Sequence, residues 1–281
     1  MTFAESHAAA AARWPAGTRP LDVATSWGRT RLLTAGPAGA PVVLLLHGGG
    51  ATATAWADLA GELAGRYRLL APEQPGDPGL SETGRPPRST ADLLSWLAEL
   101  RTACRIGRWH LVGHSAGAHL ALSSALAGPD GVASLTLLDP TAVFAGLSSR
   151  YLAHALPTLL RPTPGGLRRF LSWETRGRAL PAPWVDAWVR GATEVDRGPL
   201  VRTRRPAAGA LAALSTPTLV VVAAGSRAHA PGRVARRAAA VPAVEVLRLD
   251  AATHHTLPLL DAGEVAAALA PHLAAGEARA G

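Results

Sequence analysis

A serine stands between two glycines in the segment Gly113-His-Ser-Ala-Gly117. The apolar stretch 109–112 precedes this segment, and an Ala- and Leu-rich stretch over 118–127 follows it. The order predicts a strand, a sharp turn that holds Ser115 up, and a helix. Glycine fits both flanking positions, because a Cβ two residues before or after the serine would collide with the turn or the helix. We predict that Ser115 is a nucleophile, the alternative being a plain strand-to-helix turn.

A nucleophilic serine needs a base that takes its proton, and the base needs an acid that orients it. Two adjacent histidines, His254 and His255, follow the apolar stretch 244–249 near the C-terminus. In sheet enzymes with a serine turn of this kind the histidine comes last in the chain. We therefore predict that His254 is the base, because of its distance from the strand end, with His255 as the alternative.

Negative charge on a carbonyl oxygen requires preorganised donors, which are usually backbone N–H groups. The segment His47-Gly-Gly-Gly50 directly follows the uniformly apolar stretch 42–46, where the chain must turn. We predict that the amides of Gly49 and Ala116 are the donors, with Gly50 as an alternative to Gly49. A glycine triplet is also compatible with a merely flexible turn.

Apolar strand-like segments alternate with helical ones along most of the chain, which predicts a mostly parallel sheet. The helical segments cover 54–65, 90–104, 116–127, 231–240 and 262–274. The strand-like segments cover 21–26, 30–34, 42–46, 67–71, 109–113, 134–138, 218–223 and 244–249. The first two of these suggest an antiparallel hairpin at a sheet edge.

The alternation breaks over residues 140–213, which are rich in Pro, Arg and Trp and hold several helical segments but no convincing strand. Such an excursion is too long for an ordinary loop. It leaves the sheet at the carboxyl end of a strand, where open α/β sheets bind ligands. We expect a cap over the site there. Five aromatic residues are expected either to line an apolar pocket or to pack within the cap: Phe144, Phe170, Trp173, Trp184 and Trp188.

Together these motifs resemble the α/β-hydrolase superfamily, in particular its cap-bearing carboxylesterase-like branch. The segment 46–50 resembles the oxyanion loop, 75–81 the proline-glycine turn after the fourth strand, 113–117 the serine turn, and 253–254 the histidine position. The resemblance implies a mostly parallel eight-stranded sheet with helices on both faces and a helical cap inserted after the sixth strand. The expected core comprises 1–139 and 214–281, and the expected cap 140–213.

One departure from the family pattern concerns the acid. The family usually has Gly-x-x-Asp after the strand that corresponds to 218–223, whereas this chain reads Gly225-Ser-Arg-Ala-His229. Some relatives carry the acid at the end of the preceding strand, where this chain has Asp139. We predict that Asp139 orients the histidine, although an aspartate there can also be structural. Asp250 and Asp261 are weaker candidates.

The resemblance implies a serine hydrolase that cleaves an ester, thioester or lactone of a small, largely apolar molecule through an acyl-enzyme on Ser115. The alternative is a non-hydrolytic member of the fold that binds or cyclises a small molecule in specialised metabolism. The residues expected to contact substrate are His47, Gly48, His114, Phe144, Trp173, Trp184 and His255.

The composition and charge of the chain limit the kinds of partner that we expect. The chain has 281 residues, a formal net charge of +8, no lysine and one cysteine. We expect a cytoplasmic protein with no membrane-spanning segment, no secretion signal, no cofactor and no metal. Arginines cluster over 161–205, which indicates either a solvated face or attraction for an acidic carrier protein or coenzyme A thioester. Nucleic acid is not expected as a partner, because interleaved aromatics and a known binding motif are absent. The sequence does not indicate an oligomeric state.

Overall fold

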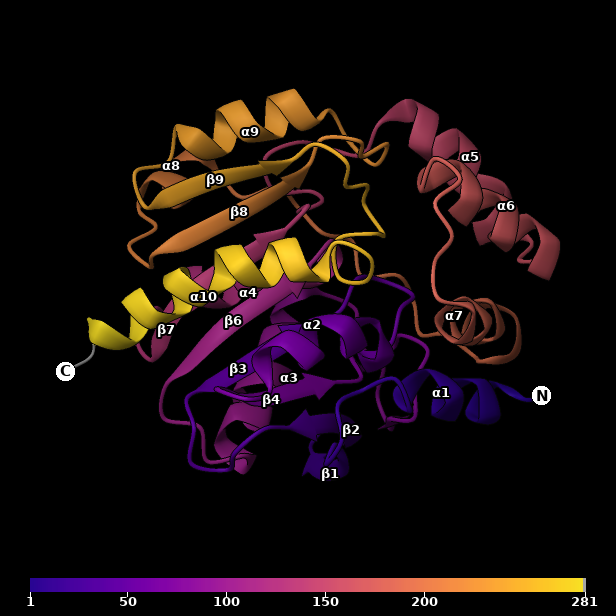
Figure 1. The fold of residues 1–281 in the computed structure, drawn as a ribbon, viewed down its shortest axis with the longest axis horizontal. Coiled ribbons are helices and arrows are strands. Elements are labelled where there is room, and N and C mark those ends of the chain that lie inside the picture. Colours follow the sequence, from indigo (N-terminus) through magenta and orange to yellow (C-terminus); the bar gives the residue numbers. More distant parts are fainter. Residues whose placement is uncertain (280–281) are drawn as a thin grey trace.

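The computed structural model describes residues 1–279, which form a sheet flanked by helices (Figure 1). The strand order is β1-β2-β4-β3-β6-β7-β8-β9, with β5 paired to β2. The strands are β1 Arg19–Thr25, β2 Gly28–Ala35, β3 Val42–Leu46, β4 Arg68–Pro72, β5 Glu82–Thr83, β6 Trp109–His114, β7 Val132–Leu138, β8 Thr218–Ala223 and β9 Val244–Leu249. The strands β4, β3, β6, β7, β8 and β9 pair in parallel in this order. Strand β2 is antiparallel to β1, β4 and β5.

Helices connect the strands and follow them along the chain. Their bounds are α1 Phe3–Ala11, η1 Ala53–Trp56, α2 Ala57–Leu63, α3 Thr90–Ala103, α4 Ala116–Ala127, α5 Ser149–Leu160, α6 Pro164–Glu174, α7 Ala182–Glu194, α8 Ala208–Ala212, α9 Pro231–Ala239 and α10 Ala262–Ala278. The predicted fold class is confirmed, and each predicted strand has its counterpart within two residues at either end. Two elements were not predicted: the two-residue β5, which is too short to leave an apolar pattern, and α1, which begins at a capping box of Thr2 and Glu5.

Helices cover both faces of the sheet, which explains the uniformly apolar central strands. Successive residues of β3 face opposite sides, so Leu44 and Leu46 pack toward α3, α4 and α9, while Val43 and Leu45 pack toward α2 and α10. All four side chains are fully buried. Each such burial contributes about 1.5–3 kcal/mol. The core therefore fixes the position of β3, and with it the loop that follows.

Parallel strands place several loops at one edge of the sheet. The chain segments that leave β3, β6, β7 and β9 begin at His47, Ser115, Asp139 and Asp250. Because these strands run in the same direction, their carboxyl ends lie together. In open α/β sheets this edge is where ligands bind.

Residues 140–213, here called the insert, connect β7 to β8 and contain α5, α6, α7 and α8. Figure 1 shows α5, α6 and α7 grouped beside one end of the sheet. The N-terminal helix α1 packs against α7, where the Phe3 N–H donates to the Glu194 carboxylate at 2.9 Å. The helical character of the insert follows the sequence-based expectation, and its first three helices, α5, α6 and α7, carry the aromatic residues that approach the sheet edge.

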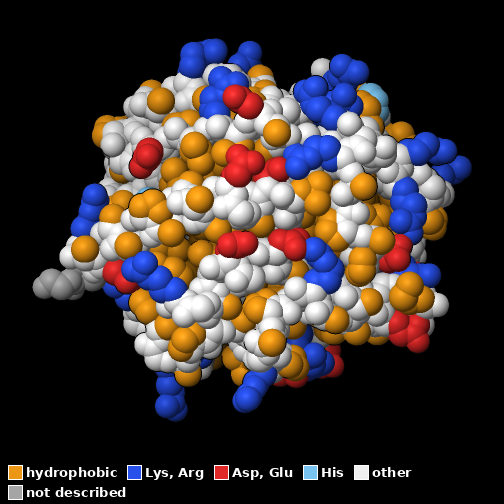
Figure 2. Space-filling view, in the orientation of Figure 1, with side chains coloured by type: hydrophobic (Ala, Val, Ile, Leu, Met, Phe, Trp, Pro, Cys, Tyr) orange, Lys and Arg blue, Asp and Glu red, His pale blue; other side chains and the backbone are white. Residues whose placement is uncertain are grey.

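The arginines of the insert are used in part within the protein. Arg176 donates to the Gly225 carbonyl at 3.0 Å, and Arg178 pairs with Asp261 at 2.6 Å. Other basic side chains remain at the surface, and Figure 2 shows them gathered over the corner that Figure 1 assigns to α5 and α6. Attraction of an acidic partner to this surface stays a prediction.

The turn between β6 and α4 has little space. Ser115 has φ 55° and ψ −115°, a conformation that non-glycine residues rarely adopt. A Cβ added to Gly113 would overlap with the Gly117 backbone, and one added to Gly117 would overlap with the Leu46 carbonyl. The two glycines therefore allow β6, α4 and β3 to meet at Ser115.

This crowding predicts a large difference between two glycine substitutions. Gly117→Ala should lower the free energy of unfolding by about 3 kcal/mol or more, because the obstacle is backbone that cannot rotate away. The matched control is Gly61→Ala in α2, where an added Cβ meets open space. That variant should be more stable than the parent by about 0.5–1 kcal/mol. Urea denaturation measures both, and equal stabilities would contradict the packing described here.

Candidate active site

Three side chains from different strand ends form one hydrogen-bonded chain. Ser115 Oγ lies 2.9 Å from His254 Nε2, and His254 Nδ1 lies 2.6 Å from Asp139 Oδ2. The carboxylate is an acceptor, so Nδ1 carries the proton of the neutral imidazole and Nε2 accepts from the serine hydroxyl. His254 and Asp139 are buried, which keeps water from competing for these bonds. This arrangement can take the proton from Ser115.

The Asp139 carboxylate has further partners beside His254. Its Oδ1 accepts from the Ala223 N–H at 3.2 Å, and its Oδ2 accepts from the Ser226 hydroxyl at 2.7 Å. His229 Nε2 lies 3.0 Å from Oδ1. Burial alone would raise the pKa of Asp139, but the nearby His229 and His254 outweigh burial and hold that pKa below its usual range. Asp139 is therefore ionised at neutral pH and can stabilise a positive charge on His254.

The segment in which the usual acid of the family is missing contacts the Asp139 carboxylate. Ser226 and His229, which contact the carboxylate, both belong to Gly225-Ser-Arg-Ala-His229. Sequence reasoning noticed only that an aspartate was missing there and did not assign a role to either residue. Of the weaker acid candidates, Asp250 is exposed and Asp261 pairs with Arg178 and Thr256.

The two histidines of the C-terminal loop have separate partners. Glu174, the last residue of α6, is fully buried and accepts from the His254 N–H at 2.9 Å. It also accepts from the His255 N–H at 3.2 Å and from His255 Nδ1 at 2.8 Å. Burial alone would raise the pKa of Glu174, but the charge and hydrogen bonds of His255, together with the charge of His254, lower it. His255 is thus bound to the insert, and His254 is the histidine that faces Ser115.

Sequence reasoning missed Glu174. An isolated glutamate in a helical segment carries no signal of burial, and its partners lie about 80 residues away in the chain. His114 also contributes to the loop, because its Nε2 donates to the His254 carbonyl at 2.8 Å. Burial lowers the pKa of His114 well below its usual range, and a positive charge on His254 or His255 would lower it further. A neutral His114 therefore supports His254 without adding charge.

The glycine loop after β3 approaches Ser115 closely. A Cβ on Gly48 would lie 3.2 Å from Ser115 Cβ, and one on Gly49 would lie 3.7 Å from Ala116 Cβ. Ala116 is the first residue of α4, where backbone N–H groups have no partner inside the helix and the helix dipole favours negative charge. The Gly50 N–H already donates to Asp77 at 2.8 Å, which favours Gly49 over Gly50 as the second donor.

His47 lies within the loop and helps to hold its shape. Its Nδ1 donates to the Gly48 carbonyl at 2.9 Å, and its Nε2 accepts from the Gln74 N–H at 3.1 Å. The Gln74 side chain donates in turn to the His47 carbonyl at 2.7 Å. His47 is fully buried, so the structure places it behind the loop and not among the groups that a substrate would contact.

A small cavity of about 50 Å³ opens at Ser115. It is lined by Gly48, Gly49, Ala51, Ala55, His114, Ser115, Tyr151, Trp184, Trp188, His254, His255 and Pro258. The structure does not bring two expected contact residues to this cavity. Phe144 packs in the core, and Trp173 stacks on His154 with ring centroids 3.9 Å apart. Tyr151 was not predicted, because a tyrosine on a helix of the insert has the same local pattern as any partly exposed aromatic residue.

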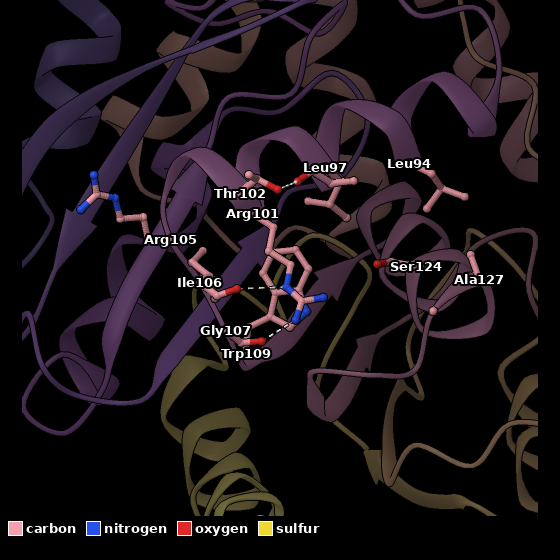
Figure 3. A pocket seen from close by; sticks show the side chains of 12 residues that line it. Leu94, Leu97, Arg101, Thr102, Arg105, Ile106, Gly107, Trp109, Ser124 and Ala127 are labelled. Atoms are coloured by element: carbon pink, nitrogen blue, oxygen red, sulfur yellow. Dashed lines mark hydrogen bonds between the residues drawn. The ribbon is translucent and has the colours of Figure 1, made fainter.

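A larger cavity of about 680 Å³ lies elsewhere, near the end of α3 and the start of β6 (Figure 3). Its Arg101 is held by backbone carbonyls, among them those of Ile106 and Asp130 at 3.1 and 3.2 Å. The cavity is not lined by Ser115, His254 or Asp139. Among residues 1–279 no cluster of His, Cys, Asp and Glu could hold a metal ion, and no helix is long and apolar enough to cross a membrane.

The chain belongs to the α/β-hydrolase family, whose model matches residues 43–268. It is 26% identical over 160 residues to the "Uncharacterized carboxylesterase nap" of Bacillus subtilis (strain 168), a match that covers 57% of this chain and 52% of that protein. The chain thus spans about half the length of this relative. It is 28% identical over 242 residues to the magnesium-chelatase 30 kDa subunit of Rhodobacter capsulatus, covering 78% of this chain and 82% of that one.

Among solved structures, the fold is similar to that of naproxen esterase (carboxylesterase NP) from Bacillus subtilis. The TM-score is 0.88 at 21% sequence identity, and the match covers 95% of each chain. At this identity the likeness concerns the fold.

The Glu174 contacts predict a pH-dependent contribution to stability. A folded-state pKa below the unfolded value of about 4.3 stabilises the fold above that pH, and this contribution disappears as the pH falls through the folded pKa. Glu174→Gln should therefore lower the free energy of unfolding by about 2 kcal/mol at pH 7 and by progressively less below about pH 4. Denaturant unfolding across pH measures this difference.

The matched control is Glu245→Gln at an exposed position of β9, which should change stability by less than about 0.5 kcal/mol. A loss in Glu174→Gln that increases toward low pH would contradict the assigned ionisation.

Proposed function

We propose that this protein is a serine hydrolase that cleaves esters of small, largely apolar molecules through an acyl-enzyme on Ser115. The hydrogen-bonded series of Ser115, His254 and Asp139 is the observation that carries this proposal. Ser115 Oγ lies 2.9 Å from His254 Nε2, and His254 Nδ1 lies 2.6 Å from Asp139 Oδ2. Membership of the α/β-hydrolase family and similarity to proteins named carboxylesterases also support it. Thioesters and lactones present the same electrophilic carbonyl and belong to the proposed substrate class.

The first half of the reaction forms the acyl-enzyme. His254 takes the proton of Ser115 as Oγ attacks the carbonyl carbon, and the resulting oxyanion accepts hydrogen bonds from the Gly49 and Ala116 amides. The negative charge of Asp139 stabilises the imidazolium that forms on His254. His254 then protonates the leaving alkoxide, and the carbon–oxygen bond of the ester breaks.

The second half returns the enzyme to its starting state. A water molecule replaces the departed alcohol, and His254 takes its proton as the water oxygen attacks the acyl carbon. Collapse of the second oxyanion breaks the bond to Ser115 Oγ, which regains its proton from His254. In this proposal the insert acts as a cap, since Tyr151, Trp184 and Trp188 line the cavity at Ser115 and limit the entry of bulk water.

The sequence also left open a non-hydrolytic protein that uses its pocket to bind or cyclise a small molecule. The sequence basis for that alternative is the missing aspartate after β8. Asp139 lies within hydrogen-bond distance of His254 and can take the role of that aspartate. The geometry favours hydrolysis.

A fluorophosphonate probe tests the proposed nucleophile directly. The folded protein should be labelled on Ser115, and mass spectrometry of the digested protein identifies the modified residue. His254→Ala should react far more slowly, because it lacks the base, and Ser115→Ala should not be labelled at this peptide. Absence of labelling in the folded parent would sink the proposed function.

Removing the negative charge of the orienting acid should slow turnover without unfolding the site. Asp139→Asn is expected to lower kcat by roughly 10⁴, as loss of the aspartate does in serine proteases, because it removes the negative charge that stabilises the imidazolium and favours the correct His254 tautomer. Steady-state hydrolysis of a simple ester measures this. The control is Asp250→Asn at the exposed neighbouring position, which should keep kcat within about twofold of the parent. An Asp139→Asn enzyme with a similarly unchanged kcat would exclude Asp139 as the acid.

A further inference from the structure

The position of His254 distinguishes the two ends of an ester bound at Ser115. His254 must hand its proton to the leaving oxygen, so the alcohol part of the ester has to lie on the side of His254. The acyl part must then extend past the oxyanion donors on the other side. The shapes of the spaces on these two sides therefore set which alcohols and which acids fit.

The cavity of about 50 Å³ described above, here called the slot, is the space that borders His254, and Gly48 and Gly49 line it as well. Aromatic side chains of the insert, Trp184 and Trp188, close it, and the fixed rings of His254 and His255 form another wall. The slot is far smaller than the roughly 300–1,000 Å³ of a site for a drug-sized ligand, so it admits only a small group.

The space on the other side is much larger, with a volume of about 460 Å³, and is here called the groove. It begins at Gly49 and Ala116, the same residues that border the oxyanion position, and is not lined by Ser115 or His254. A volume of this size falls in the range that holds drug-sized ligands, roughly 300–1,000 Å³.

The walls of the groove are mainly apolar. Leu93 of α3, Leu120 of α4, Leu159 of α5 and Val201 of the insert line it, and Leu200 lies exposed at the same place. Polar groups gather at one end, where the Gly50 N–H donates to Asp77 and the Arg197 guanidinium packs against Gly50. The groove thus has polar groups beside Gly49 and mainly apolar walls elsewhere.

We infer that the enzyme acts on esters of small alcohols, such as methyl or ethyl esters, with large apolar acyl groups. The inference rests on the proposed function and specifies its substrate class. The acyl chain lies in the groove and remains attached to Ser115 Oγ after the first step. The small alkoxide takes the proton from His254 in the slot and leaves as an alcohol, and water then releases the acid.

Two isomeric esters test this assignment. Methyl octanoate and heptyl acetate have the same formula, but one has a large acyl group and the other a large alcohol. Because one methylene that fits or does not fit a pocket changes kcat/KM by about 10-fold or more, methyl octanoate should exceed heptyl acetate by at least tenfold. Equal values, or a preference for heptyl acetate, would overturn the assignment.

Matched variants connect the preference to each space. Trp188→Leu, which widens the slot, should raise kcat/KM for heptyl acetate relative to methyl octanoate. Val201→Trp, which narrows the groove, should lower kcat/KM for methyl octanoate relative to methyl acetate. Thermal unfolding of each variant checks that the fold is retained. If a variant does not fold, the parent enzyme's preference between the two isomers still tests the assignment.

Labelling of Ser115 by the fluorophosphonate probe separates the two possible failures. Labelled Ser115 with no preference, a reversed preference or no hydrolysis of either isomer overturns the slot and groove assignment alone. An unlabelled Ser115 with no hydrolysis of either isomer overturns the proposed function, and the assignment with it.

Discussion

The hydrogen bond between Asp139 and His254 is the interaction on which the site depends. It joins the segments that follow β7 and β9 through two residues 115 positions apart in sequence, and it lies in buried surroundings. Isolating a carboxylate from water is costly unless other groups bind it, and here Ala223, Ser226 and His229 surround it. The remainder of the site is arranged around this anion: it orients the imidazole, and the imidazole orients toward Ser115.

Holding these groups requires backbone conformations that the chain would not adopt by itself. Ser115 has φ 55° and Asp139 has φ 41°, both in a region that costs a non-glycine residue of order 1–3 kcal/mol. The buried strands on either side offset this cost, because β6 and β7 are pinned by packing on both faces. The insert contributes from the other direction, since Glu174 binds the backbone of the loop that carries His254. The residues that stabilise this part of the fold thus also position the groups that would react.

Sequence predicted the parts of the molecule that depend on local pattern. The apolar runs located the strands, and the glycines around Ser115 located the turn, because each reports a local steric or burial requirement. Distance from the strand end favoured His254 over His255, and the resemblance to relatives with the acid after the preceding strand favoured Asp139. These two residues lie within hydrogen-bond distance. Glu174, Ser226, His229 and Tyr151 escaped prediction because their roles arise from contacts across the fold. Phe144 and Trp173 were expected at the cavity but lie elsewhere. The sequence around an aromatic residue of the insert looks the same whether that residue faces a cavity or the core.

The central geometric feature of the site is a His254 ring whose Nδ1–H donates to Asp139 and whose Nε2 accepts from the Ser115 hydroxyl. Nitrogen-15 NMR of histidine-labelled protein near pH 8, with His254 identified by its absence from a His254→Gln spectrum, reports this protonation directly. We expect a protonated Nδ1 and an unprotonated Nε2. A His254 ring with its proton on Nε2 could not accept from the serine hydroxyl and would contradict this arrangement.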